Sequence, residues 1–231
     1  MNAPRASIIL PVYNQEDHIR AVIEEYAASL GRLGMPYEIL PVINGVQRDR
    51  SLEICREMEE RLPSVRTLAI DGAGWGRAVR HGLQQASGDL LCYTNSARTS
   101  SKDLLLLLLY GSIHTDSVIK ANRKIREHWR RRMGSLLYNL QCRSLFDLPY
   151  WDINGTPKVF HRSLSRLLDL TRDDDLIDLE FNAICRAEGY PVIEVPIFST
   201  SRRSGRSTTN WLSALRMYRG AFQFRREFKR R

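Results

Sequence analysis

Residues 6–14 read Ala-Ser-Ile-Ile-Leu-Pro-Val-Tyr-Asn, a short apolar run that ends in two polar residues. Apolar and β-branched residues in a run of this length predict a buried strand over 7–12. Residues 15–30 then carry apolar side chains at helical spacing, namely Ile19, Val22, Ile23, Tyr26, Ala27 and Leu30. This spacing predicts an amphipathic helix directly after the strand. A buried strand followed by such a helix is typical of the first unit of an α/β fold.

The alternation of strand and helix continues along the chain. Further strands are predicted over 37–43, 65–70, 89–93 and 117–121, with intervening helices over 48–62, 77–86 and 101–110. Beyond residue 121 we predict a helix over 133–145, a strand over 158–161, a helix over 175–188 and a last strand over 191–198. Strands separated by helices need crossover connections, so the chain is expected to form a mainly parallel central sheet.

Four loops follow the first predicted strands and should meet at one edge of the sheet. They contain Tyr13-Asn14, Asn44-Gly45, residues 71–76 and residues 95–98. Ligands of open α/β sheets bind beyond the carboxyl ends of the strands. These loops are therefore the expected binding site, and the closely spaced glycines of the third loop could let the backbone approach a phosphate or ribose.

The positive charge of the chain is concentrated near its C-terminus. The 231 residues carry a formal net charge of +9, yet residues 202–231 hold ten Lys or Arg and one Asp or Glu, which leaves 25 of each sign in residues 1–201. A formally neutral body with a basic tail differs from a nucleic-acid-binding domain, whose basic residues cover a folded face. We expect no nucleic-acid partner.

The sequence also argues against metal-binding cysteines and membrane-spanning segments. Cys55, Cys92, Cys142 and Cys185 lie far apart and match no zinc or redox spacing, so we expect free thiols in a reducing compartment. The longest apolar run, residues 104–109, falls short of a bilayer span, and the N-terminal run is too short for a secretory signal. These observations favour a cytoplasmic protein.

Several segments, in order along the chain, resemble one known family. The segments are Ile9-Leu10-Pro11-Val12-Tyr13-Asn14, residues 74–83 followed by Ala86-Ser87-Gly88-Asp89, residues 152–160, and Glu194-Val195-Pro196 with the basic loop 202–207. Together they resemble glycosyltransferase family 2, and the last two resemble its polyprenol-phosphate branch. The resemblance implies a single GT-A (Rossmann-like) nucleotide-sugar-binding domain over 1–207, with halves of about 1–121 and 122–207, and a tail over 208–231.

The resemblance further implies transfer of a sugar, with inversion at the anomeric carbon, from a nucleotide sugar to a polyprenyl phosphate or to a lipid-linked or cell-surface glycan. Three groups of residues would carry this reaction. The nucleotide sugar would contact Pro11, Tyr13, Asn14, Asn44, Gly45, Gly74, Gly76, Arg77, Asn95, Ser96 and Arg98. The acceptor phosphate would contact Arg123, Lys158, Arg202, Arg203 and Ser207. The catalytic candidates are Asp152, Lys158 and Arg203.

The sequence departs from the family where a metal ion would bind. Family members place an Asp-x-Asp motif after the fourth strand to hold Mg²⁺ or Mn²⁺, whereas this chain has Asn95-Ser96-Ala97, and Ile43-Asn44 replace an acidic pair after the second strand. An amide and a hydroxyl are poor ligands for magnesium. Three interpretations stay open: a metal-independent transferase that uses Arg and Lys, a transferase with displaced metal ligands, and a degenerate homologue that binds a nucleotide sugar or recruits a partner without catalysis.

The acceptor decides whether the reaction needs a base. A phosphate acceptor is already anionic at neutral pH and needs none, whereas a sugar hydroxyl would need a carboxylate such as Asp152, Asp178 or Glu180.

In the tail, Trp211, Leu215, Tyr218 and Phe222 recur at helical spacing among arginines. This pattern is typical of a peripheral helix at an anionic membrane surface, and it also fits a helix that packs on its own domain.

Overall fold

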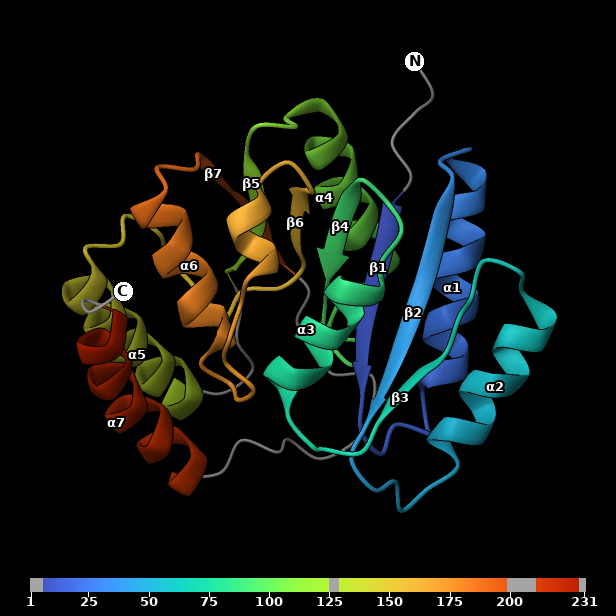
Figure 1. The fold of residues 1–231 in the computed structure, drawn as a ribbon, viewed down its shortest axis with the longest axis horizontal. Coiled ribbons are helices and arrows are strands. Elements are labelled where there is room, and N and C mark those ends of the chain that lie inside the picture. The colour runs from blue at the N-terminus through green and yellow to red at the C-terminus, as the bar shows by residue number, and fades with distance from the viewer. Residues whose placement is uncertain (1–5, 125–128, 199–210, 229–231) are drawn as a thin grey trace.

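The computed structural model describes residues 6–124, 129–198 and 211–228, without the side chains of 129–132 and 211–215. The described residues form one seven-stranded sheet with helices on both faces (Figure 1). The strands are β1 (Ala6–Val12), β2 (Tyr37–Asn44), β3 (Leu68–Ile70), β4 (Leu90–Tyr93), β5 (Val118–Arg123), β6 (Lys158–His161) and β7 (Val192–Ile197). The helices are α1 (Ile19–Arg32), α2 (Ser51–Arg61), α3 (Trp75–Gln85), α4 (Ser101–Ile113), α5 (Trp129–Phe146), the 3-10 helix η1 (Ser165–Leu168), α6 (Ile177–Ala187) and α7 (Trp211–Phe228).

The strand order is β3-β2-β1-β4-β6-β5-β7. All neighbouring strands pair in parallel except β6, which runs antiparallel to both β4 and β5. The prediction of a single α/β domain with a mainly parallel sheet is confirmed. Strand β6 enters the sheet between β4 and β5, and its register sets Lys158 opposite Tyr93 of β4 and Lys120 of β5.

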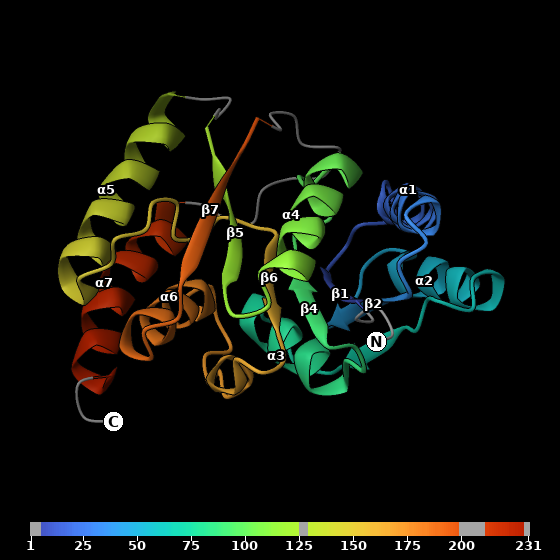
Figure 2. The same cartoon turned by 90° about the horizontal axis from the view of Figure 1, so that it is seen from above.

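Two apolar cores cover the two faces of the sheet. Helices α1, α2 and α4 bury one set of side chains, including Ile8 and Leu10 of β1. Helices α3, α5, α6 and α7 bury the other set, including Ile9 of the same strand. Successive side chains of a strand point to opposite faces, which explains why neighbouring residues of β1 belong to different cores. Figure 2 shows α1 and α4 on the opposite side of the sheet from α3 and α6.

The third strand is shorter than the sequence predicts. It starts at Leu68, and Val65 forms only an isolated bridge with Ile39. Between them, the Thr67 amide donates to Glu59 and its hydroxyl donates to the Cys55 carbonyl, both on α2. These bonds hold Thr67 toward the helix, and the regular ladder resumes only at Leu68.

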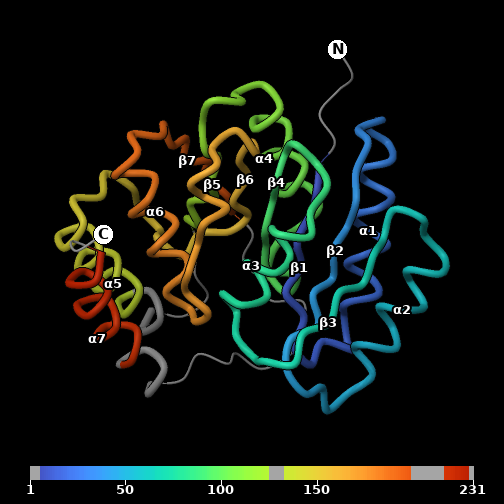
Figure 3. Tube along the Cα trace, viewed as in Figure 1, coloured from blue at the N-terminus to red at the C-terminus, as the bar shows by residue number. Residues whose placement is uncertain are grey.

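Helix α7 packs on its own domain, beside α5 in the views of Figures 1 and 3. The ring of Phe224 stacks on Phe146 with centroids 5.4 Å apart, and Tyr218 meets Tyr138 edge-on at 5.6 Å. Ala221 and Phe224 are buried in the core. The expected boundary between domain and tail at residue 207 lies outside the described residues and stays a prediction. Among the described helices none has the length and apolar character needed to cross a bilayer.

Candidate functional site

A polar cavity of about 610 Å³ opens at the carboxyl ends of β1, β2 and β4. Six residues expected to contact a nucleotide sugar line it, namely Pro11, Tyr13, Asn14, Asn44, Gly74 and Asn95. They come from the end of β1 and from all four of the expected loops. This placement agrees with the rule that open α/β sheets bind ligands at this edge.

Asn44 fixes the relative positions of three of these loops. Its side-chain amide donates to the Val12 carbonyl at 2.9 Å, and its Oδ1 accepts the Gly74 amide at 3.1 Å. Asn44 is buried, so both bonds are shielded from water. Asn44 therefore ties the end of β1 to the start of α3.

The loop after β1 is held in a tight turn. Asn14 has φ of 50°, a conformation that Asn tolerates better than most residues. Its amide donates to the Gln47 side chain at 2.8 Å, and its Oδ1 accepts the Arg48 amide at 2.8 Å. Tyr13 is 37% exposed at the cavity. An exposed aromatic ring on a fixed loop can stack on a nucleobase.

The glycines of the third loop serve close packing against residues 171–175. A Cβ on Gly74 would lie 2.4 Å from the Asp173 carbonyl oxygen, and one on Gly76 would lie 2.4 Å from that of Arg172. Gly45 has φ of +70° and faces Ala73. Arg77 donates to Asp173 from its side chain at 3.0 Å and from its amide at 3.1 Å. These close contacts are enough to explain why glycine occupies positions 74 and 76, whether or not a phosphate binds there.

The segment Asn95-Ser96-Ala97 lies at the cavity with its polar groups engaged. Asn95 Oδ1 accepts the Ala97 amide at 3.0 Å, and the buried Ser96 hydroxyl donates to Gln15. Arg98 follows in the same turn, its amide bonded to the Asn95 carbonyl. No cluster of three or more His, Cys, Asp or Glu side chains suited to a metal ion occurs within 6–124, 129–198 and 211–228. The residues at this position do not fit a divalent cation.

The opposite wall of the cavity was not expected from the sequence. It consists of the loop before α6 and one face of α7, namely Arg172, Asp174, Asp175, Leu176, Arg216, Met217, Gly220 and Gln223. The helical spacing of Trp211, Leu215, Tyr218 and Phe222 indicated a helix here, but it did not indicate which other face of that helix would reach the cavity. Arg172 donates to Asp174 at 3.0 Å and to Glu227 of α7 at 3.3 Å, joining the two segments.

Asp175 is exposed at the cavity wall, and its pKa is raised above the usual range for a carboxyl group. The surrounding protein partly desolvates the group, the carboxylates of Asp178 and Asp174 add to the shift, and the charge of Arg216 opposes it. The wall therefore brings carboxylates and a guanidinium group close enough to act on one another.

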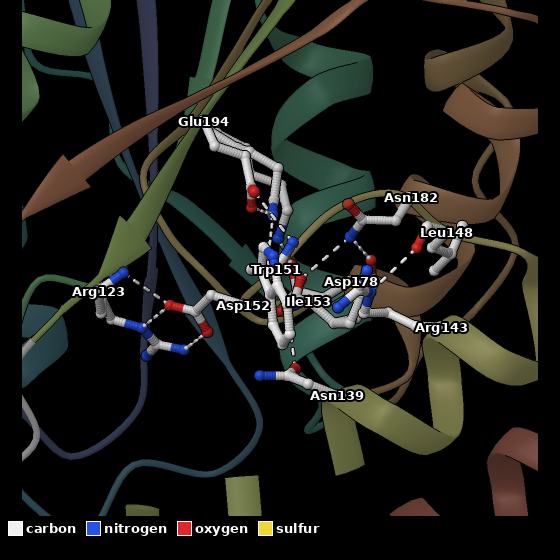
Figure 4. Close-up of polar contacts among 12 residues, drawn as sticks. Arg123, Asn139, Arg143, Leu148, Trp151, Asp152, Ile153, Asp178, Asn182 and Glu194 are labelled. Atoms are coloured by element: carbon white, nitrogen blue, oxygen red, sulfur yellow. Dashed lines mark hydrogen bonds and ion pairs between the residues drawn. The ribbon is translucent and has the colours of Figure 1, made fainter. Parts of the chain in front are cut away.

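Asp152 and Arg123, the last residue of β5, form a partly buried bidentate pair (Figure 4). Arg123 Nε and Nη2 each donate to one carboxylate oxygen at 2.7 Å, and the Arg123 amide adds a bond of 2.9 Å. Asp152 has φ of 45°, which the surrounding bonds hold in place. This carboxylate, expected to be catalytic, is engaged by the arginine expected to bind the acceptor phosphate. The pairing favours a structural role for Asp152.

Lys158 lies in the core, fully buried between the sheet and α6. Its ammonium group pairs with Asp178, which also accepts the Tyr93 hydroxyl at 2.9 Å. The ammonium group lies 5.3 Å from the Tyr93 ring centroid and 5.7 Å from that of Phe181. Burial lowers the pKa of Lys158, and the charge of Asp178 opposes this shift. The placement favours a structural role over the catalytic one expected from the sequence.

The remaining expected site residues lie apart from the cavity or outside the described residues. Glu180 accepts the Thr171 hydroxyl and the amides of Thr171 and Arg172, so it holds the loop before α6. Arg202, Arg203 and Ser207 fall in 199–210, which the structure does not describe. Their roles at an acceptor phosphate stay predictions.

Comparison with known proteins identifies the family. The sequence model described as "Glycosyl transferase family 2" matches residues 7–168, well over half of the chain. The chain belongs to this family. It is 25% identical over 218 residues to an undecaprenyl-phosphate 4-deoxy-4-formamido-L-arabinose transferase of Pectobacterium atrosepticum, across 91% of this chain and 64% of that protein. A transferase of the same name from Pseudomonas aeruginosa is 26% identical over 162 residues, across 68% of this chain and 47% of that protein.

Solved structures share the fold of this family 2 chain. Glucosyl-3-phosphoglycerate synthase from Mycobacterium tuberculosis, solved with Mn²⁺, UDP and phosphoglyceric acid, superimposes with a TM-score of 0.72 at 15% identity, covering 96% of this chain and 78% of that one. The family resemblance and the GT-A-type fold predicted from the sequence are therefore confirmed. The chain spans less than two thirds of the length of the transferases it matches.

Proposed function

We propose that this family 2 chain transfers a sugar, with inversion, from a nucleotide-sugar donor to a polyprenyl phosphate. The observation that carries the proposal is the polar cavity at the carboxyl ends of β1, β2 and β4, lined by the strand-end loops of a chain whose relatives are named undecaprenyl-phosphate sugar transferases. A cavity of about 610 Å³ is within the usual range for small-molecule sites.

The reaction forms one bond and breaks another at the anomeric carbon. A phosphate oxygen of the acceptor attacks that carbon as its bond to the donor diphosphate breaks, and the nucleoside diphosphate leaves with the electron pair. Asp152, Asp178 and Glu180, the candidate bases for a sugar hydroxyl, are engaged by Arg123, by Lys158, and by Thr171 and Arg172. Their engagement supports a phosphate acceptor, which needs no base, over a glycan.

The acceptor phosphate would be bound by the basic loop. Arg202, Arg203 and Ser207 stay our candidates because they lie in the motif that resembles the polyprenol-phosphate branch. Arginine suits this role because its guanidinium group grips phosphate oxygens through two parallel hydrogen bonds and keeps its charge at neutral pH. Of the proposed catalytic residues, Arg203 is therefore the one we would test first.

A lipid-linked acceptor requires contact with a membrane, and α5 offers a surface for it. Met133, Leu136, Leu137 and Leu140 lie along one exposed stripe of this helix, and Leu140 is 61% exposed. Arginines at 130–132 precede the stripe, and the arginines of α7 add positive charge. An apolar stripe flanked by basic residues suits an anionic bilayer surface, which agrees with peripheral association at the cytoplasmic face.

Sedimentation with vesicles tests this contact. Leu137→Glu combined with Leu140→Glu should reduce binding to vesicles of phosphatidylcholine and phosphatidylglycerol, whereas Leu109→Glu, an exposed position on α4, should not. Equal binding of all three proteins would remove α5 from the proposed membrane contact.

The second candidate function is a catalytically silent family member that binds a nucleotide sugar or recruits a partner. The observation that favours it is the replacement of the acidic metal motif by Asn95-Ser96-Ala97. The deciding assay supplies a panel of nucleotide sugars and a short polyprenyl phosphate and measures lipid-linked sugar. Turnover supports the transferase. Nucleotide binding with no turnover on any donor, with or without Mg²⁺ or Mn²⁺, supports the silent protein.

A further inference from the structure

We propose that the C-terminal helix α7 completes the donor pocket, where Arg216, together with the indole N–H of Trp75, binds the donor diphosphate in place of a divalent cation. The inference rests on the proposed function, because it concerns the same cavity. It assigns to α7 a role in donor binding in addition to any contact with a membrane.

Among the residues that the structure describes, the strand-end wall of the cavity carries no carboxylate to hold a metal ion. On the wall formed by β1, β2 and β4, the side chains of Asn44 and Asn95 lack a charge, and their Oδ1 atoms accept the Gly74 and Ala97 amides. The carboxylates that line the cavity, Asp174 and Asp175, belong to the opposite wall. The Asp174 carboxylate is bonded to Arg172 and to the Leu176 amide, an arrangement typical of loop structure.

Arg216 places a positive charge on the wall that faces Asn44 and Asn95 across the cavity. Arg216 lines the cavity and is exposed to it, and its charge acts on Asp175. The neighbouring charges on this wall are Arg172 and Asp174, which pair with each other, and the exposed carboxyl group of Asp175. A guanidinium group can neutralise charge that develops on a leaving diphosphate without a metal ion.

Helix α7 is packed closely enough to hold an arginine in one position. Gly220 packs so closely on Leu176 that an added Cβ would lie 2.6 Å from its Cδ1 atom. The Arg172–Glu227 ion pair and the buried Phe224 fix the next turns of the helix to the loop before α6 and to the core. A binding group on a packed helix keeps its geometry better than one on a loop.

The facing wall carries a hydrogen-bond donor that has no partner among the described residues. Trp75 lines the cavity from the first turn of α3, and its Nε1 atom is buried with no hydrogen-bond partner among the described residues. A buried N–H group without a partner costs free energy, which a ligand oxygen at this point would recover. Trp75 and Arg216 thus offer a neutral and a charged donor from two walls of one cavity.

Nucleotide binding to the whole chain tests the inference. The diphosphates UDP, GDP, CDP and ADP are titrated by calorimetry in EDTA and in Mg²⁺, and the tightest is compared with its nucleoside. Arg216→Gln should weaken diphosphate binding about 10- to 100-fold, the size of a hydrogen bond to a charged group, and leave the nucleoside unaffected. Trp75→Phe should weaken it by less, about 3- to 10-fold, because its bond comes from a neutral donor.

Arg219→Gln is the matched control. Arg219 lies one turn along the same helix, is exposed, and does not line the cavity, so the substitution removes the same charge without removing the contact. Equal loss in the two arginine variants would show a general field effect and overturn the inference. So would loss of binding in EDTA, or failure of all four diphosphates to bind. Metal-independent binding through Arg216 without sugar transfer would uphold the inference while refuting the proposed transferase activity.

Discussion

The substitution Lys158→Met tests whether Lys158 stabilises the core or binds a phosphate. The lysine side chain is fully buried and the Asp178 side chain is 7% exposed, so the substitution leaves a buried carboxylate with the Tyr93 hydroxyl as a hydrogen-bond donor. Removing one partner of a buried ion pair costs about 3–5 kcal/mol. We therefore expect Lys158→Met to lower the free energy of unfolding by about this amount, a large part of the roughly 5–15 kcal/mol of a typical domain.

The double variant Lys158→Met, Asp178→Asn measures how strongly the two residues depend on each other for stability. It leaves no buried charge, and the Asn side chain can still accept the Tyr93 hydroxyl that now bonds to Asp178. The double variant should therefore unfold within about 2 kcal/mol of the original protein, although Lys158→Met alone costs more. Such coupling is the mark of an ion pair whose members act on each other.

Denaturant unfolding, followed by circular dichroism and tryptophan fluorescence at neutral pH, measures these differences. Lys102→Met, the same substitution at an exposed position on α4, should stay within about 0.5 kcal/mol of the original protein. The reasoning is refuted if Lys158→Met unfolds at the original denaturant midpoint and yet loses sugar transfer. That result would return Lys158 to the acceptor phosphate, where the sequence motif had placed it.

Three further predictions concern the described contacts. Gly76→Ala should cost about 1–3 kcal/mol in denaturant unfolding, because its Cβ would meet two backbone carbonyls, whereas Gly134→Ala, where nothing lies within 4 Å, should stabilise α5 by about 0.5–1 kcal/mol. Phe224→Ala should cost about 3–5 kcal/mol in thermal or denaturant unfolding, and the exposed Phe222→Ala far less; equal losses would show that α7 does not pack as described. Burial raises the pKa of Cys55, Cys142 and Cys185 to about 12, so the folded state keeps thiol protons that the unfolded chain loses from about pH 9. The free energy of unfolding should therefore fall as the pH rises from about 9 to about 12. Replacing the three cysteines with Ala should flatten that slope.

The sequence predicted the strands and helices well because each has a clear period. The apolar run of β1 and the helical spacing of α1 are local signals, and the structure places both elements within a few residues of their predicted bounds. No such signal showed that the third strand would start at Leu68 and not at Val65. It depends on bonds from Thr67 to α2, and side-chain contacts between elements are not visible in a periodic pattern.

The candidate site was predictable on one wall only. Pro11, Asn44 and Asn95 lie at or just after the carboxyl ends of strands, and these ends must meet at one edge of a parallel sheet. Arg172 and Arg216 reach the same cavity from a loop and a helix far along the chain, and neither belongs to a strand-end motif. Close contacts of Gly74 and Gly76 with the carbonyls of residues 172–174 were not visible in the sequence, and a contact of these glycines with a phosphate stays a prediction.

Helix α7 presents three different faces, one to the core, one to the cavity and one to the surface. Ala221 and Phe224 face the core, Arg216 and Gly220 face the cavity, and Arg219 and Phe222 lie exposed. A helix that turns once in 3.6 residues separates these sets by spacing alone, so no change in composition marks them in the sequence. The positive charge of the tail is therefore divided among these faces. Under the proposed donor site, Arg216 would supply positive charge for a bound diphosphate from the wall opposite Asn44 and Asn95, while the exposed arginines would stay free for other contacts at the surface.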